Sequence, residues 1–355
     1  MKKKKVYIEL LRIIASALVI YNHLPGIILY MSTSGIIQDI HIMIPAFVKI
    51  AVPIFLMISG AVLLGGKEED YKTVFRKRIK RSFLVLLIFE VGMYCLILLR
   101  MAIKHESMPI NPISTFIFGF IHGDLDSLDA YWYMYIYLGF LFALPLLRRV
   151  ANGFNDKDFV FLTSLRFFFY TFLTFINYFL DKANINDIDF SGGFNLPFVF
   201  ADLFFYPLIG YYLDNVLDIE RLKKKHIIIM LLMIPSCLLS CVWCHHASID
   251  YSEMFDFIIA IDFFVLIKIF TLKILTKRPD YDKLSKTICF IGSLTFGIYM
   301  MHVPINYILA GKYYQFVEPL LGTFVTSLTW VLVNMFIGGS FTILLKKLPV
   351  FKNLL

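Results

Sequence analysis

Charged residues are scarce in this chain, and acidic residues are the scarcer kind. Only 17% of the 355 residues are charged, whereas soluble domains average about 25%. Lys and Arg number 34 against 26 Asp and Glu, which gives a net charge of +8, and 59% of the residues are hydrophobic. This composition excludes an ordinary soluble domain and indicates a chain that crosses a membrane several times.

Cysteine is also sparse, and its placement excludes a disulfide framework. The five cysteines all fall in or at the ends of apolar runs. Cys241 and Cys244, followed by His245, have the spacing of a c-type haem attachment site. An apolar helix around Cys241 leaves no pocket for a porphyrin, so we interpret these cysteines as small apolar residues. Zinc-site spacings, Gly-rich phosphate loops and G-x-S-x-G motifs are all missing, so no metal is expected.

Apolar runs long enough to span a bilayer recur along the whole chain. Each span needs about 20 residues, and about ten candidates meet that length. They lie at about 6–25, 41–64, 82–103, 128–147, 159–180, 195–213, 226–244, 254–275, 288–310 and 317–345. The loops between them are too short to fold alone. The sequence therefore predicts one all-α, polytopic membrane bundle over residues 1–355.

Basic residues gather in alternate loops, which predicts the orientation. With the N-terminus in the cytoplasm, the cytoplasmic segments hold 26 of the 34 Lys and Arg. These segments are Lys2–Lys5, Lys67–Arg81, Arg148–Lys157, Arg221–Lys225, Lys273–Lys286 and Lys346–Lys352. This asymmetry is the positive-inside rule. It places both termini in the cytoplasm and explains the net charge without nucleic acid.

The stretch Tyr7–Leu24 is apolar but carries an unexpected polar stripe. Eleven residues separate Arg12 and His23, which is three helical turns plus about 20°, so both share one face about 16 Å apart. Glu9 and Ser16 lie on that face, one turn from Arg12. A central Arg in lipid costs about 2.5 to more than 10 kcal/mol. We therefore expect the stripe to face the protein interior or a wet cavity.

Two readings of this stripe remain open from the residues alone. A neutral His is suited to accept a proton near pH 7, and Arg is suited to bind phosphate or carboxylate. His23 and Arg12 then form parts of a site near opposite ends of one helix. The alternative is a structural Glu9–Arg12 pair with His23 closing the helix.

Other charged residues also fall in or beside apolar runs. Arg76, Arg78 and Arg81 belong to a basic run that binds either lipid headgroups or the phosphates of a cytoplasmic cofactor. His302, expected near the outer side, either closes a helix before Pro304 or serves as a second base candidate. Further buried charges have no partner that the sequence identifies: Lys49, Glu90, Arg166, Asp202, Asp256, Asp262 and Lys268.

The order of these motifs resembles acyltransferase family 3, the integral-membrane O-acyltransferases of bacterial envelope and exported glycans. Arg12 and His23 on the first span match the hallmark of that family. Supporting stretches are PIFLMISGAVLL (Pro53–Leu64), FRKRIKR (Phe75–Arg81), YWYMYIYLGFLFALPLL (Tyr131–Leu147), GIYMMHVP (Gly297–Pro304) and the C-terminal LKKLPVFKNLL. The resemblance covers nearly the whole chain.

The resemblance implies a bundle of about ten helices in the bacterial plasma membrane. The donor is an acyl-CoA, usually acetyl-CoA, and the acceptor is a hydroxyl of an envelope glycan or glycolipid. His23 matches the catalytic position, and Arg12 is its motif partner. Arg76 and Arg78 match the basic motif of the family, which favours donor binding over lipid contact.

We therefore expect an O-acyltransferase that acts on a cell-envelope polysaccharide or glycolipid. His23 is the expected general base, Arg12 orients the donor or stabilises the thioester oxygen, and Glu9 holds Arg12. Arg76, Arg78 and Arg81 are expected to bind the CoA phosphates, and no permanently bound cofactor is expected. The alternative is a polysaccharide or lipid-linked sugar exporter of the same family, which needs a wide passage rather than a narrow tunnel.

Overall fold

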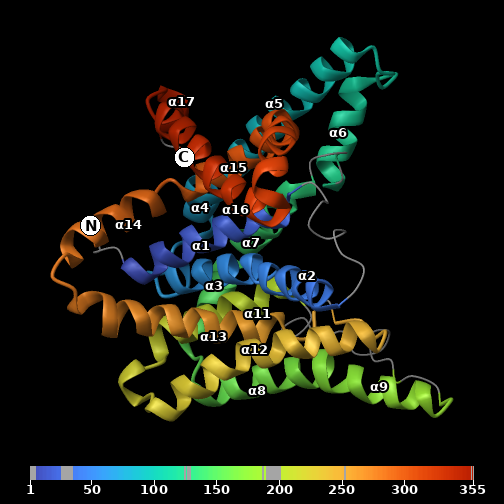
Figure 1. Cartoon of the computed structure of the whole chain (residues 1–355). Helices are drawn as coiled ribbons and strands as arrows, with labels where there is room; N and C mark the ends of the chain where they lie inside the picture. Colours follow the sequence, from blue (N-terminus) through green and yellow to red (C-terminus); the bar gives the residue numbers. More distant parts are fainter. Residues whose placement is uncertain are drawn as a thin grey trace. The chain divides into compact units, whose positions relative to one another are not determined.

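The computed structural model describes residues 5–24, 35–123, 125, 129–185, 188, 201–251, 253–352 and 354. Every regular element among these residues is a helix (Figure 1). Six helical stretches are long and apolar enough to cross a membrane: Gly35–Leu63, Tyr71–Lys104, Trp132–Asn152, Asp156–Lys182, Lys224–His246 and Thr295–Leu345. The predicted all-α, polytopic class is confirmed, and the protein is an integral membrane protein. The number of ten spans stays a prediction.

The last two expected spans have different boundaries in the structure. The apolar run 288–310 predicts one helix, but Ser293 and Leu294 separate α14 (Tyr281–Gly292) from α15 (Thr295–Ile305). Helical structure then continues to the end of α16 (Gly311–Leu345). α16 bends at Gly322, whose φ of 71° is readily available only to glycine. The expected span 195–213 begins among residues outside the described ones.

The chain divides into two compact units. Unit 1 contains Met1–Lys67 and Leu146–Ser293, and unit 2 contains Glu68–Pro145 and Leu294–Leu355. α7 (Trp132–Asn152) belongs to both and contains Pro145 at the boundary. The expectation of a single functional domain stays a prediction, and each unit is described separately.

Unit 1 is built around α1. α1 (Val6–Asn22) packs against α3 (Ala51–Leu63), α13 (Asp256–Ile269) and α14, and Figure 1 shows α1 and α3 side by side. α12 (Lys224–His246) packs against α13 and α2 (Gly35–Val48). The remaining helices are α8 (Asp156–Phe167), the π-helical η3 (Phe168–Phe172), α9 (Leu173–Lys182), α11 (Asp202–Tyr211), η4 (Tyr212–Val216), η5 (Ile219–Arg221), η6 (Phe270–Ile274) and η7 (Leu275–Lys277).

Unit 2 contains the basic segment and the C-terminal helices. α15 packs against α16, and α5 (Lys80–Lys104) packs against α6 (Pro112–His122). α6 has 11 residues and a length of about 16 Å, so it is too short to span. The other elements are α4 (Tyr71–Val74), the π-helical η1 (Phe75–Ile79), η2 (Asp129–Tyr131), η8 (Asn306–Ala310) and α17 (Pro349–Lys352).

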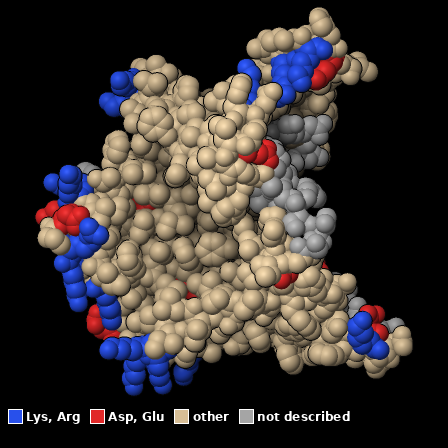
Figure 2. All heavy atoms as spheres, viewed as in Figure 1, with Lys and Arg blue, Asp and Glu red and all other residues tan. Residues whose placement is uncertain are grey.

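Charged side chains gather at helix ends and leave a broad uncharged surface (Figure 2). On α12, Ile228, Leu232 and Leu239 are exposed, as expected for a face that contacts lipid. The exposed lysines of unit 1 include Lys223–Lys225, where α12 begins. The orientation of the chain in the membrane stays a prediction.

Two glycines bring α3 and α11 unusually close. A Cβ on Gly60 would overlap the carbonyl oxygen of Pro207, and a Cβ on Gly210 would overlap that of Met57. Small residues of this kind let membrane helices approach until their backbones touch. The pair fixes α11 against α3 at the centre of unit 1.

We expect Gly60→Ala to destabilise the protein by about 1–3 kcal/mol, because the new methyl group collides with backbone. The measurement is the apparent melting temperature of detergent-purified protein. Gly92→Ala is the control, since nothing lies within 4 Å of a Cβ at that position in α5. If both variants melted together with the wild type, the close packing of α3 on α11 would be contradicted.

We expect Lys182→Cys, at the end of α9, to react with a membrane-impermeant thiol reagent added outside intact cells. Lys225→Cys, in the first turn of α12, should react only after permeabilisation. Cys95 and Cys289 are first replaced by Ser, because neither is buried and both could react with the reagent. Cys237, Cys241 and Cys244 are buried and are kept. The reverse labelling pattern would overturn the orientation.

Candidate functional site

Two members of the polar stripe of α1 face the interior of unit 1, as its composition predicts, and Arg12 and His23 are half-buried. Glu9 and Ser16 are 3% and 1% exposed. The carboxylate of Glu9 accepts a hydrogen bond from Nη1 of Arg12 at 3.0 Å. Ser16 donates its hydroxyl to the carbonyl oxygen of Arg12 at 2.8 Å, so it closes the turn of its own helix. The predicted pairing of Glu9 with Arg12 is present.

Arg12 retains hydrogen-bonding capacity after pairing with Glu9. Its side chain is 30% exposed, whereas that of Glu9 is 4% exposed. A guanidinium has five N–H donors, and among the described residues Glu9 is the side chain that engages it. An Arg fixed by a buried carboxylate, with its other donors reachable, is suited to bind an anionic or carbonyl group.

His23 directly follows the last helical residue of α1. Its ring Nδ1 lies 2.9 Å from the carbonyl oxygen of Val19. A carbonyl oxygen only accepts, so Nδ1 carries the proton in this bond and the basic lone pair of the neutral ring is on Nε2. The side chain is half-buried. Both open readings fit, because the residue closes the helix and also has the tautomer of a general base.

Gly292 at the end of α14 is a residue that the sequence reasoning missed. A Cβ at this position would lie 2.7 Å from the Cβ of Glu9 and would overlap its carboxylate. α14 packs on α1 at this point. Gly292 therefore leaves the space in which the Glu9–Arg12 pair sits, and only a glycine within an apolar run pointed to it.

The basic run lies in unit 2, over η1 and the start of α5. Arg78 donates two hydrogen bonds to the carboxylate of Glu69, at 3.0 and 3.2 Å, and Arg81 donates to the carbonyl oxygen of Leu354. Arg76 is exposed and has no hydrogen bond or ion pair among the described residues. Of the three predicted anion-binding residues, Arg76 has no polar contact with the described residues, Arg78 pairs with Glu69, and Arg81 bonds to a backbone carbonyl oxygen.

Asp70 begins the helical part of this segment. Its side chain accepts a hydrogen bond from the backbone N–H of Thr73 at 3.2 Å. This bond holds the pKa of Asp70 below its usual value, so the carboxylate stays charged at the N-terminus of α4. The helical segment that carries the basic run therefore begins at an N-cap formed by Asp70.

His302, the second base candidate, is fully buried in unit 2. Its Nδ1 bonds to the carbonyl oxygen of Tyr299, and its own carbonyl oxygen accepts from Asn334 on α16. Trp330 and Asn334 both donate to Asn306 nearby. His302 therefore belongs to the polar network that joins α15 to α16.

Several buried charges acquire partners that sequence spacing does not reveal. Arg166 pairs with Asp202 at 2.9 Å and its guanidinium lies over the ring of Tyr170. Lys268 donates to the carbonyl oxygen of Leu213 at 2.6 Å. In the described part of the chain, His, Cys, Asp and Glu form no group of three that could hold a metal ion.

Comparison with known proteins identifies the family of the chain. No curated protein and no solved structure matches the chain. The profile of the acyltransferase 3 family, described as an acyltransferase domain, matches residues 5–344. That range holds the Arg12–His23 helix, the basic run and His302, and it leaves out only the ends. The chain belongs to the acyltransferase 3 family of membrane acyltransferases.

Proposed function

We propose that the protein transfers an acetyl or other short acyl group from acyl-CoA to a hydroxyl of a cell-envelope or exported glycan or glycolipid. The family assigns an acyltransferase, and the loop charges support a donor that arrives from the cytoplasm. The proposed location is the bacterial plasma membrane with both termini in the cytoplasm.

The observation that carries this proposal is the hydrogen bond from His23 to Val19. It fixes the tautomer in which Nε2 is basic, at the end of α1 and half-buried. A general base needs this state near neutral pH. A partly buried setting also limits water, which competes with the acceptor hydroxyl for the thioester.

The proposed transfer step begins at the basic nitrogen of His23. Nε2 of His23 takes the proton of the acceptor hydroxyl while that oxygen forms a bond to the thioester carbon. The carbon–sulfur bond then breaks, and the CoA sulfur leaves with the electron pair. His23 returns the proton to that sulfur, which releases the free thiol and restores the neutral ring.

Arg12 acts on the donor at a distance from the reacting carbon. Eleven residues of helix place it about 16 Å from His23. A hydrogen bond to the thioester oxygen must be about 3 Å long while the base touches the same centre. Of the two roles expected for Arg12, orienting the donor fits this spacing, and Glu9 fixes the guanidinium for that role.

The basic run supplies the phosphate-binding part of the proposal. CoA carries several phosphate charges, and Arg is the side chain best able to bind them. Arg76 is available as it stands. Arg78 is paired with Glu69, so phosphate has to compete with that carboxylate.

We expect Arg76→Ala to weaken CoA binding by about 1.5–3 kcal/mol, the value of a charge-assisted hydrogen bond. Glu69→Gln should tighten CoA binding, because it frees Arg78 from its anionic partner. Isothermal titration calorimetry of purified protein with CoA measures both. Arg100→Ala, near the far end of α5, is the matched control. An unchanged affinity for CoA in both variants would favour the alternative interpretation, in which the basic run contacts lipid headgroups.

We expect His23→Ala and His23→Gln to lower kcat by about 10²–10⁴-fold, the usual contribution of general-base catalysis. Gln is included because it keeps a hydrogen-bond donor but accepts no proton. Initial rates of acyl transfer at saturating donor measure the effect. Asn22→Ala is the control, since Asn22 is exposed and one position away.

Wild-type turnover in both His23 variants, with normal yield and CoA binding, would disprove the base assignment. His302 would then be the next candidate for the general base and the next residue to substitute. If the wild-type protein transferred nothing to any glycan while glycan still reached the cell surface, the exporter alternative would be favoured instead.

A further inference from the structure

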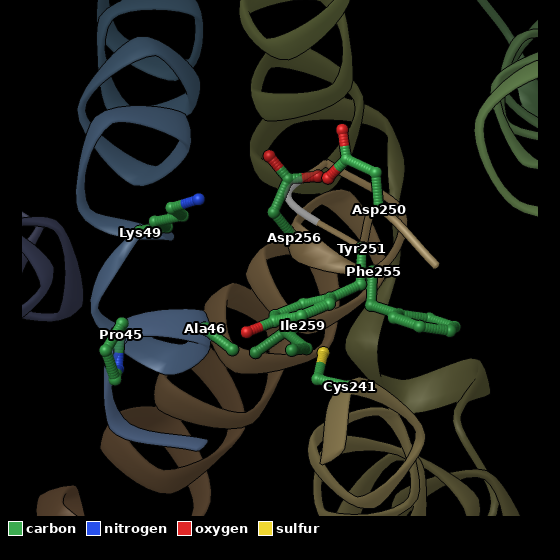
Figure 3. Close-up of a pocket in the computed structure, with 9 residues that line it drawn as sticks. All are labelled: Pro45, Ala46, Lys49, Cys241, Asp250, Tyr251, Phe255, Asp256 and Ile259. Atoms are coloured by element: carbon green, nitrogen blue, oxygen red, sulfur yellow. The ribbon is translucent and has the colours of Figure 1, made fainter. Parts of the chain in front are cut away.

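Unit 1 contains a pocket of about 250 Å³ that the proposed reaction has not yet used (Figure 3). Its walls come from the end of α2, from α12, from the start of α13 and from the segment between α12 and α13. The lining combines one cation, two carboxylates and two aromatic rings: Lys49, Asp250, Asp256, Tyr251 and Phe255. Lys49 lies about 200 positions before the other four in the sequence, so no local motif joins it to them.

Lys49 is the unusual member of this lining. It follows α2 within the apolar stretch Gly35–Leu63, yet it is exposed and makes no hydrogen bond or ion pair with the described residues. Figure 3 shows its amine directed toward the side of the pocket that carries Asp250 and Asp256. An ionisable group at membrane depth marks a functional site by default. Lys49 therefore has donors available for a ligand in the pocket.

Two hydrogen bonds from the protein fix the carboxylate of Asp256 in the pocket. Its Oδ2 accepts from the Tyr206 hydroxyl at 3.2 Å, and its Oδ1 accepts from the backbone N–H of Phe257 at 2.7 Å. Tyr206 is itself fully buried, and the Arg166 guanidinium lies over its ring at 5.4 Å. Each carboxylate oxygen can accept a further hydrogen bond. The carboxylate is therefore preorganised, with capacity remaining for a donor in the pocket.

The aromatic residues and the pocket size narrow the ligand class. Phe255 is buried in the wall, and burial raises the pKa of the Tyr251 hydroxyl, which therefore stays protonated and able to donate. Carboxylates that accept from hydroxyls, an ammonium that donates and rings that pack on C–H groups suit a sugar. Two carboxylates disfavour the phosphates of CoA. Ligand pockets commonly enclose about 300–1,000 Å³, so this smaller volume suits a single ring.

The pocket lies at the same end of unit 1 as His23. Lys268 lies about 18 Å along α13 from Asp256. Lys268 donates to the carbonyl oxygen of Leu213, and Lys5 pairs with Asp214, the next residue. Lys5 and Lys268 therefore mark one end of unit 1. α1 leads from that end to His23, α13 leads from it to Asp256, and α1 packs against both α13 and α2.

We propose that this pocket binds one sugar ring of the acceptor, with Asp256 and Lys49 hydrogen-bonded to its hydroxyls. The proposal rests on the proposed function and adds to it the place where the acceptor is held. Lys49 and Asp256 are positioning residues here, since the proton transfer belongs to His23.

Asp256→Asn and Lys49→Met test this role by kinetics. We expect KM for the acceptor to rise about tenfold or more in each, because each loses a charge-assisted hydrogen bond. The value of kcat and the affinity for CoA should change little. Asp282→Asn and Lys225→Met are the controls, since both residues are exposed elsewhere in unit 1. An unchanged acceptor KM in an enzyme that does transfer acyl groups would overturn the pocket and leave the proposed function intact.

A binding measurement on the wild-type protein keeps the proposal independent of turnover and of variant folding. Reductive methylation followed by mass spectrometry reports how fast Lys49 and Lys225 react. Glucose and N-acetylglucosamine, each as monosaccharide and tetrasaccharide, are the probes. Protection of Lys49 alone by any of them supports the pocket, even if no acyl transfer is seen. Equal reactivity of Lys49 with and without every probe would overturn it.

Discussion

The pairing of charges inside an apolar bundle is the constraint on which unit 1 depends. Each ionisable group that α1, α8 and α13 carry into the interior has to be neutralised or hydrogen-bonded, because the alternative is exposure to lipid. Glu9 meets Arg12, Arg166 meets Asp202, and Lys268 meets a helix-terminal carbonyl oxygen. These contacts determine which helix faces lie inward. Within the described ranges of unit 1, Arg12 keeps spare donors and Lys49 has no ion pair, and substrate contacts are proposed at both.

Periodicity and composition were sufficient to predict the local features of the fold. The membrane class, the apolar helices and the inward face of Glu9 and Ser16 all come from local pattern, and the structure confirms them. Helix ends were less predictable, because the apolar run continues through Ser293 and Leu294, where the structure separates two helices. Partners distant from each other in the sequence were not predictable, although the Glu9–Arg12 pair within one helix was. Asp202 for Arg166, Glu69 for Arg78 and the space that Gly292 leaves for Glu9 depend on tertiary packing.

The hydrogen bond between His23 and Val19 shows why two readings of one residue are compatible. A histidine that closes a helix by donating from Nδ1 is thereby fixed in the tautomer whose other nitrogen is basic. The structural role is therefore compatible with the catalytic role proposed for His23. The same logic applies to Glu9, which neutralises Arg12 and also fixes the direction of its remaining donors.

Acyl transfer by the purified protein is the central claim, and one labelling experiment addresses it directly. Wild-type protein in detergent or liposomes is incubated with acetyl-CoA radiolabelled in the acetyl group and a panel of envelope glycans. The account predicts that label moves from CoA to a glycan as a base-labile ester, with one free thiol released per ester formed. Label that remains on CoA, or appears only as free acetate with every glycan tested, would contradict it.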